Sequence, residues 1–120
     1  MVCGGLGGVM EAACRGARSQ GGLTIGILPG SDRREANEFV DVAIPTGMGE
    51  MRNALIVRAA DAVIAVSGEF GTLSEIGFAL KLGKRVVGLS TWQLSRGGEL
   101  SDAILTADSA PEAVRLALTP

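Results

Sequence analysis

The sequence contains no histidine and no tyrosine among its 120 residues. Without histidine, a single subunit cannot hold a Ser-His-Asp or Cys-His nucleophile system or an HExxH zinc site. It also has no histidine or tyrosine to act as a proton shuttle. Any catalysis therefore has to rest on Asp, Glu, Arg, Lys, Ser, Thr and Cys side chains.

Cysteine is scarce as well. Cys3 and Cys14 are the only two, eleven positions apart, and no CxxC pair occurs. This spacing indicates neither a disulfide framework nor a zinc site. We expect two free thiols in a reducing compartment and no bound metal.

Long apolar runs and long basic runs are also missing. No apolar stretch comes near the ~18 residues that a membrane span requires, and the N-terminus lacks the charged and apolar regions of a signal peptide. The net charge is -2, aromatic residues make up 3%, and no basic run is longer than Arg33-Arg34, which is no footprint for nucleic acid. We expect a cytoplasmic protein that engages neither a membrane nor nucleic acid.

The residues that are present have the composition of a globular protein. Hydrophobic residues make up 47% of the chain, and 18 residues are glycine. A chain of this length can bury roughly two thirds of its unfolded surface, so a core forms without disulfide or metal staples. We expect a single domain over residues 1–120.

Short apolar runs alternate with helical patterns along the chain. The predicted strands cover residues 24–28, 38–44, 62–66, 85–89 and 103–106, and the predicted helices cover residues 9–18, 50–60, 72–82 and 111–118. Strands that alternate with helices pair in parallel through right-handed crossovers. The predicted fold class is α/β, a doubly wound and mainly parallel sheet with helices on both faces and ligands outside the carboxyl ends of its strands.

The start of the chain is unusual for such a fold. Only Met1-Val2-Cys3 precede the first glycine cluster, where a doubly wound sheet opens with a complete strand. We expect a leading strand and helix to be missing from this chain. A version extended upstream by roughly thirty residues, the size of a βα unit, should then be more stable.

The first glycine cluster, Gly4-Gly5-Leu6-Gly7-Gly8, lies between a strand end and a helix start. Backbone N–H groups and the helix dipole favour an anion at such a place. The cluster spells neither GxGxxG nor a Walker loop, which argues against an ordinary nicotinamide or NTP site. The alternative is that its glycines only allow the strand and helix to pack tightly.

A second turn, residues 67–72 with the sequence SGEFGT, repeats this arrangement after the most hydrophobic strand. Two anion-ready turns at one sheet edge indicate a phosphorylated ligand. Thr72 and Glu75 also have the spacing of a capping box, in which each side chain bonds the other residue's backbone amide. Glu75 is therefore either a capping residue or a functional one.

A third segment, residues 46–53, places glycines before a helix whose first turn carries Arg52 and Asn53. A guanidinium at this place can grip a phosphate or carboxylate with two hydrogen bonds. A lone surface arginine would mean little, but two glycine loops accompany this one.

Together these segments resemble the Rossmann-like superfamily that contains the cytokinin-activating (LOG-type, "lysine decarboxylase-like") phosphoribohydrolases and the molybdenum cofactor carrier proteins. Residues 3–10, CGGLGGVM, are similar to the first glycine loop GGGxxGLM, and residues 49–53, GEMRN, stand in the place of MxxRK and keep Arg52. Residues 67–75, SGEFGTLSE, are similar to PGGxGTxEE and keep Gly68, Gly71, Thr72 and Glu75. The resemblance covers nearly the whole chain.

The resemblance implies roles for particular residues. In a hydrolase, Arg52 and Glu75 would be catalytic, since a carboxylate can stabilise the oxocarbenium-like state of N-glycosidic cleavage while arginine holds the ligand. The implied ligand-binding residues are Gly4, Gly5, Gly7, Gly8, Arg52, Asn53, Gly68, Gly71 and Thr72. The family also implies a homodimer or a higher homo-oligomer.

Departures from the hydrolase motifs favour the carrier-like branch. Asn53 replaces a lysine, Glu69 replaces a glycine inside the second turn, and Ser74 replaces the first glutamate. A lysine decarboxylase is not supported, because a pyridoxal Schiff base needs a suitably placed lysine and the only two, Lys81 and Lys84, stand at a helix end.

The functional hypothesis is a carrier-like protein that binds a phosphorylated nucleotide-like or pterin-type ligand. It requires no further cofactor, and its bound ligand would be a nucleotide or the molybdenum cofactor. The alternative is a nucleoside 5'-monophosphate phosphoribohydrolase that releases a base and ribose 5-phosphate. A third hypothesis is a dimerisation module whose glycine loops are vestigial.

Overall fold

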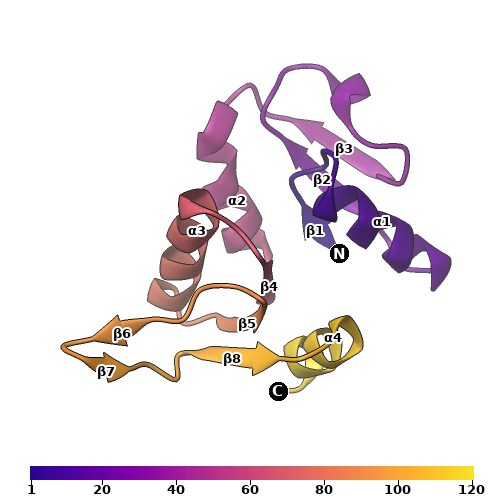
Figure 1. Ribbon diagram of the computed structural model, residues 1–120. Coiled ribbons are helices and arrows are strands. Elements are labelled where there is room, and N and C mark those ends of the chain that lie inside the picture. The colour runs from indigo at the N-terminus through magenta and orange to yellow at the C-terminus, as the bar shows by residue number, and fades with distance from the viewer. The chain divides into compact units, whose positions relative to one another are not determined.

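The computed structural model describes all residues from 1 to 120. The chain divides into two compact units, Met1–Ala59 and Ala60–Pro120. Each unit contains its own three-stranded sheet, and every pairing within these two sheets is parallel (Figure 1). The predicted parallel α/β fold is therefore confirmed.

The first unit is built on the sheet β1-β2-β3. Its elements are β1 (Val2–Cys3), α1 (Val9–Ser19), β2 (Ile25–Leu28), a 3-10 helix (Arg33–Glu35), β3 (Val42–Pro45), a second 3-10 helix (Gly49–Met51) and α2 (Arg52–Ala59). In the register of the sheet, Gly26 pairs with Cys3 on one side and with Ala43 on the other. Parallel neighbours need a crossover connection, and α1 provides it between β1 and β2.

The core of this unit lies around β2, where Leu28 is fully buried together with Cys14 of α1. Helix α2 packs against β1 and β2 and buries Val57. The helical periodicity places Met51 and Leu55 on one face, and both are exposed, Met51 by 72% and Leu55 by 38%.

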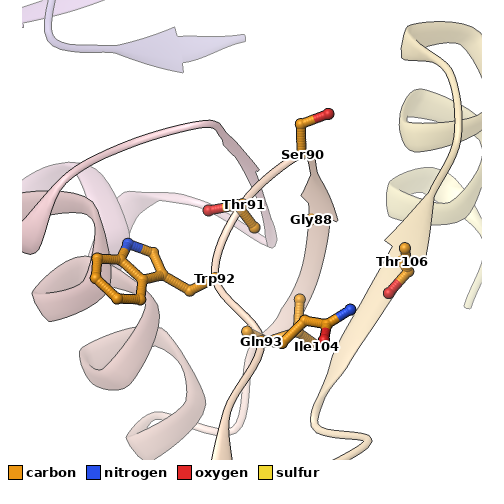
Figure 2. A pocket seen from close by; sticks show the side chains of 7 residues that line it. All are labelled: Gly88, Ser90, Thr91, Trp92, Gln93, Ile104 and Thr106. Carbon is orange, nitrogen blue, oxygen red and sulfur yellow. The ribbon is translucent and has the colours of Figure 1, made fainter.

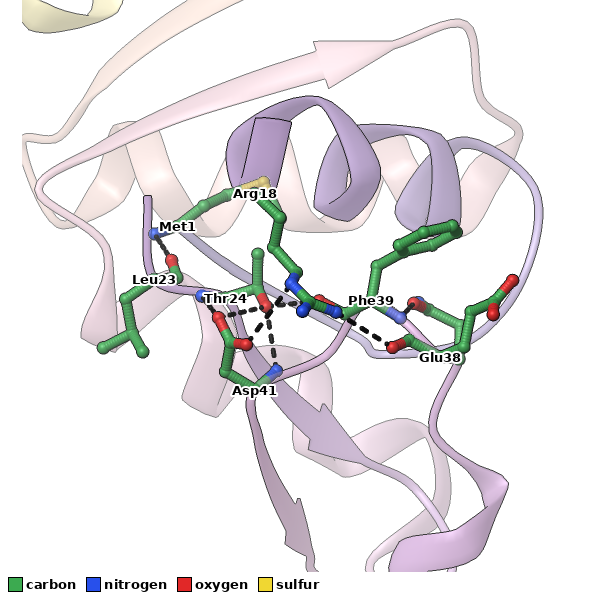
Figure 3. Close-up of polar contacts among 8 residues, drawn as sticks. Met1, Arg18, Leu23, Thr24, Glu38, Phe39 and Asp41 are labelled. Atoms are coloured by element: carbon green, nitrogen blue, oxygen red, sulfur yellow. Dashed lines mark hydrogen bonds and ion pairs between the residues drawn. The ribbon is translucent and has the colours of Figure 1, made fainter. Parts of the chain in front are cut away.

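A polar network fixes the chain between β2 and β3 (Figure 3). The buried Thr24 hydroxyl donates to the Phe39 carbonyl, and the backbone N–H of Asp41 donates to the same hydroxyl at 2.9 Å. The backbone N–H of Thr24 donates to the Asp41 carboxylate at 3.0 Å, and Arg18 lies 3.5 Å from that carboxylate. The hydrogen bonds that the backbone N–H and the hydroxyl of Thr24 donate to the Asp41 carboxylate, and to a lesser degree Arg18, lower the pKa of Asp41.

The same network explains why the predicted strand 38–44 is shorter than expected. Residues 38–41 are held by side-chain and turn hydrogen bonds, and β3 begins only at Val42. The preceding polar segment also contains a short 3-10 helix, Arg33–Glu35, in place of a loop without regular structure. The carboxylate of Asp32, the N-capping residue of this helix, accepts hydrogen bonds from Arg34, and these lower its pKa.

The second unit is built on the sheet β4-β5-β8. Its elements are β4 (Ala62–Val66), α3 (Phe70–Lys81), β5 (Arg85–Leu89), β6 (Ser95–Arg96), β7 (Glu99–Leu100), β8 (Ile104–Ala107) and α4 (Ala110–Leu118). The predicted strands 62–66 and 85–89 are confirmed to the residue. Both are rich in β-branched and other apolar residues, which favour strands.

Both faces of β5 are buried. Val86 and Val87 are each 0% exposed, and their side chains point to opposite faces because they are neighbours in a strand. Val87 forms a core cluster with Ala107 of β8 and Ala113 of α4. Helix α3 packs against β4 and β5 and buries Ile76. Ser109 caps α4 by accepting from the N–H of Glu112, and Pro111 lies in the first turn as expected.

One hairpin is absent from the elements that the sequence predicts. Strands β6 and β7 pair in antiparallel fashion around Gly97-Gly98, whose φ angles are 59° and 83°. Two glycines with positive φ between two strands form the usual two-residue hairpin loop. The glycine pair is the available signal, but the flanking strands have only two residues each and show no alternating pattern. None of the four helices is long and apolar enough to cross a membrane.

Candidate functional site

The glycines of the first loop differ in how closely other atoms surround them. Gly5 has a φ of 76°, and a Cβ added to it would lie 2.7 Å from Leu28 Cδ2 and 3.1 Å from Gly26 Cα. This glycine lets the loop pack on β2. Gly7 and Gly8, in contrast, are exposed, and a Cβ added at either position would have no atom within 4 Å. Tight packing therefore explains the glycine at position 5, but it does not explain those at positions 7 and 8.

Gly4 has a third role, which concerns Arg52. A Cβ on Gly4 would lie 2.7 Å from Arg52 Nη2, 2.9 Å from Arg52 Cζ and 2.8 Å from Met10 Sδ. The guanidinium thus rests on the bare Cα of the loop. The structure brings together two sequence-predicted site residues that are 48 positions apart, from 4 to 52.

One N–H group of Arg52 is hydrogen-bonded within the protein, and another is unpaired. Its Nη1 donates to the side-chain oxygen of Asn53. Its Nε is buried, yet it has no hydrogen-bond partner within the protein. An unpaired buried donor costs free energy, so an acceptor supplied from outside the chain would be favoured here. Asn53, another predicted site residue, therefore orients the arginine.

The start of α1 faces the same loop. Its N-terminal capping residue is Gly8, and no side chain caps the first turn. The first four N–H groups of a helix have no partner within the helix, and they carry the positive end of the helix dipole. The loop and the helix start can therefore serve an anion, as the sequence predicts for this cluster.

Sequence reasoning misses Asn37 as a support of this loop. Its side-chain amide donates to the Leu6 carbonyl at 2.9 Å, and its backbone N–H donates to the Gly5 carbonyl at 2.8 Å. Asn37 in turn accepts from the N–H of Phe39 at 2.9 Å. The loop carbonyls are thereby engaged on one side. Nothing in the sequence marks Asn37, which ends a polar, charged segment typical of a mobile loop.

The second glycine turn follows β4 and opens α3. Helix α3 begins at Phe70, and its N-terminal capping residue is Glu69, which makes no side-chain cap. The predicted capping box of Thr72 and Glu75 is therefore wrong, because Thr72 lies inside the first turn. Instead, Thr72 packs over Gly68, where an added Cβ would collide with the Thr72 side chain. Gly68 has a φ of 102° and is required both for this contact and for this backbone conformation.

Two serines in the second unit adopt a backbone conformation that is uncommon outside glycine. Ser67 and Ser90 each have a φ of 52°, and each directly follows a strand, β4 and β5 respectively. Such residues occur at functional sites more often than elsewhere. Proline is fixed near a φ of about -65°, so it could not occupy position 67 here. The proline at this place in PGGxGTxEE would therefore not fit the backbone conformation of Ser67.

Side chains from the loop after β5 hold the second turn in place. The Thr91 hydroxyl donates to the Ser67 carbonyl at 2.5 Å, and the Trp92 indole N–H donates to the Glu69 carbonyl at 3.1 Å. The Trp92 ring lies 5.6 Å from that of Phe70, centroid to centroid. Glu69 itself is exposed, in the turn where its charge would oppose a phosphate.

A small cavity lies between β8 and the loop that follows β5 (Figure 2). It is lined by Gly88, Ser90, Thr91, Trp92, Gln93, Ile104 and Thr106. Its volume of about 100 Å³ is well below the roughly 300–1,000 Å³ of pockets that hold small molecules. This cavity carries no ligand site by itself. No group of three or more His, Cys, Asp and Glu side chains could hold a metal ion.

The predicted site residues thus fall into two sets. Gly4, Gly5, Gly7, Gly8, Arg52 and Asn53 belong to the first unit, and Gly68, Gly71, Thr72 and Glu75 belong to the second. Contact between Arg52 and the loop at Gly4 unites the first set. Glu75 is half-buried in α3, and whether it acts with Arg52 stays a prediction.

The parallel sheets, the crossover helices and the glycine loop at a strand end define a Rossmann-like α/β protein. Residues 1–117 match the SLOG cluster4 family, and the chain belongs to that family.

Two solved structures of similar fold are those of molybdenum cofactor proteins. A molybdenum cofactor binding protein from the phototrophic bacterium Rippkaea orientalis is 35% identical, with a TM-score of 0.80 over 96% of this chain and 73% of that one. The molybdenum cofactor carrier protein of Chlamydomonas reinhardtii is 31% identical, with a TM-score of 0.76 over 95% of this chain and 72% of that one. These matches confirm the resemblance to the superfamily, and they fit its carrier-like branch.

A curated relative is closer in sequence. An uncharacterised protein of Archaeoglobus fulgidus is 53% identical over 89 residues, which are 74% of this chain and 58% of that protein. The match therefore spans less than two thirds of the relative's length.

Proposed function

We propose that this chain binds a phosphorylated pterin-type or nucleotide-like ligand as a carrier, with the molybdenum cofactor as the first candidate. The observation that carries this proposal is the Arg52 guanidinium on Gly4, with its Nε buried and without a protein acceptor. A phosphate oxygen is an acceptor that would satisfy that N–H and compensate the charge.

The surroundings of Arg52 fit the phosphate of such a ligand. The uncapped start of α1 and the open backbone at Gly7 and Gly8 would supply N–H donors. Arg52 would add the fixed positive charge, and Asn53 would hold its orientation. These interactions retain a ligand without any chemical step, as a carrier requires.

The similar structures support this choice of ligand. Two of them are a binding protein and a carrier protein for the molybdenum cofactor, each over 30% identical to this chain. Ser67 and the carboxylate at Glu69 also depart from the hydrolase motif.

We expect a homodimer or higher homo-oligomer in the cytoplasm. Size-exclusion chromatography with light scattering would measure the oligomeric state, and cell fractionation would measure the location.

A first experiment identifies what the native protein carries. Small molecules that co-purify with the protein would be surveyed by mass spectrometry, and molybdenum would be measured in the same sample. We expect a phosphorylated pterin or nucleotide to be enriched. If nothing phosphorylated is enriched and calorimetry with nucleotides is flat, the dimerisation module becomes the better hypothesis.

A second experiment tests the role of Arg52. Calorimetry would compare GMP, guanosine and ribose 5-phosphate as probes for wild type, Arg52→Ala and Arg52→Lys. Loss of a charge-assisted hydrogen bond costs roughly 1.5–3 kcal/mol, or about 10- to 150-fold in affinity. We expect that loss for the two phosphorylated probes only. Arg15→Ala is the matched control, because Arg15 is an exposed arginine on α1 of the same unit.

The same assay separates the carrier from the phosphoribohydrolase. Free guanine and ribose 5-phosphate would be measured after incubation of wild type with GMP. A carrier binds GMP and returns it intact, whereas release of guanine would assign the hydrolase. Unchanged phosphate binding in Arg52→Ala would remove the proposed site altogether.

A further inference from the structure

The two cysteines of the chain are in contact. Cys3 Sγ at the end of β1 lies 3.5 Å from Cys14 Sγ on α1, at hydrogen-bond distance for sulfur. They are the only cysteines in the sequence. Their spacing of eleven residues gives no sign of this pairing. The crossover from β1 through α1 brings them together, and the proposed ligand site uses neither.

The two thiols differ in accessibility. Cys14 is 0% exposed, whereas Cys3 is only partly buried. Burial and the neighbouring Cys3 raise the pKa of the Cys14 thiol to about 11. Cys14 is therefore protonated at neutral pH and shielded from reagents, and any reaction with a small molecule has to begin at Cys3.

We propose that Cys3 and Cys14 form a reversible intramolecular disulfide, with hydrogen peroxide as the oxidant. The sulfurs have to approach from 3.5 Å to a bond length of about 2.05 Å. The Cys3 end of the pair has room to adjust, because β1 has only two residues and the loop that follows it is rich in glycine.

The reaction balances in two steps. The Cys3 thiolate attacks one peroxide oxygen, the O–O bond breaks, and Cys3 becomes a sulfenic acid as hydroxide leaves. Cys14 Sγ then attacks the Cys3 sulfur, the S–O bond breaks, and the departing hydroxide takes the Cys14 proton as water. The two sulfurs lose two electrons in total, and the peroxide is reduced to two waters. A dithiol reductant reverses the change.

The disulfide would alter the first glycine loop. In the reduced chain the backbone N–H of Gly5 donates to Cys3 Sγ at 3.3 Å. A sulfur bonded to Cys14 would sit in a new position, so this hydrogen bond would lengthen or break. Gly4, on which Arg52 rests, lies between the two residues of that hydrogen bond. Oxidation would therefore change the conformation of the loop around Gly4.

The test treats the folded, reduced protein with hydrogen peroxide and then counts thiols after denaturation. We expect both thiols to be lost, a mass about 2 Da lower because two hydrogens leave, and a digest fragment that links positions 3 and 14. A dithiol should restore both thiols. Hydrogen exchange should differ between the two forms over residues 4–9.

Two variants test the order of the steps. Cys14→Ala should accumulate a sulfenic acid at Cys3, which dimedone traps. Cys3→Ser should leave Cys14 unmodified under the same treatment. Measurements on wild type stand alone if a variant fails to fold. The proposal is overturned if both thiols survive in wild type, if the disulfide forms between two chains, or if dimedone labels Cys14.

Discussion

The glycines of the first loop give a sharp prediction, because substitution by alanine should affect ligand binding at one position and stability at its neighbour. Gly4→Ala places a methyl group 2.7 Å from Arg52 Nη2 and 2.8 Å from Met10 Sδ. Both atoms lie at the far ends of flexible side chains, and Gly4 has no positive φ. The side chains can move aside, so we expect a change in stability of less than about 1 kcal/mol. The guanidinium would be displaced from the loop, however.

Gly5→Ala should behave differently. Its methyl group would lie 2.7 Å from Leu28 Cδ2 and 3.1 Å from Gly26 Cα, and Leu28 is fully buried. Overpacking of a core costs typically about 1–3 kcal/mol, and a φ of 76° adds roughly 1–2 kcal/mol for a residue with a Cβ. We expect a loss of at least about 2 kcal/mol in the free energy of unfolding.

The assay combines urea unfolding, followed by circular dichroism, with calorimetry of GMP binding. Gly4→Ala should weaken GMP binding at nearly unchanged stability, and Gly5→Ala should lower stability. Gly7→Ala is the control for stability, because no atom lies within 4 Å of a Cβ at that position. The reasoning is refuted if Gly4→Ala binds GMP as wild type does, or if Gly5→Ala is as stable as Gly7→Ala.

Further predictions concern the catalytic alternative, the polar network and the domain. Glu75→Gln should change GMP affinity by no more than a few fold, and loss of a base release shown by wild type would reveal catalysis by Glu75. Thr24→Val should lower stability by about 1–3 kcal/mol, measured by urea unfolding, because it removes the hydroxyl's hydrogen bonds to the Phe39 carbonyl and the Asp41 carboxylate. The pKa of Asp41 is lowered from 3.8 in the folded state, so its stabilising effect is full above that value and is lost as the pH falls through the lower one. Unfolding midpoints of Asp41→Asn should therefore fall less steeply with acid than those of wild type. If residues 1–120 act as one domain, urea unfolding should show a single transition by all probes.

The strands that the sequence locates best are those whose residues alone determine the outcome. Residues 62–66 and 85–89 are short runs rich in apolar and β-branched side chains, and this local pattern predicts a strand without reference to the rest of the chain. The strand at 38–44 is located less well. Its start depends on hydrogen bonds between Thr24 and Asp41, which are 17 positions apart, and periodicity contains no information about such a pair.

The candidate site shows the same division. Glycine clusters followed by helical patterns indicate the first loop correctly, because glycine before a helix is a local signal. Partners of that loop cannot be deduced locally. Asn37 becomes visible only through its hydrogen bonds to Gly5 and Leu6. The capping box fails at Thr72 because α3 starts two residues earlier, where the backbone after Gly68 turns directly into the helix.

The contact between Trp92 and the second glycine turn has a practical consequence. The chain has one tryptophan and no tyrosine, so fluorescence excited at the red edge of indole absorption comes from a single place. That indole donates to the Glu69 carbonyl and lies beside the Phe70 ring. Its emission reports the polarity and motion around the start of α3, without any attached dye. A rearrangement of the turn would change the emission wavelength or lifetime, whereas an event confined to the first unit and not transmitted to the second would leave both unchanged.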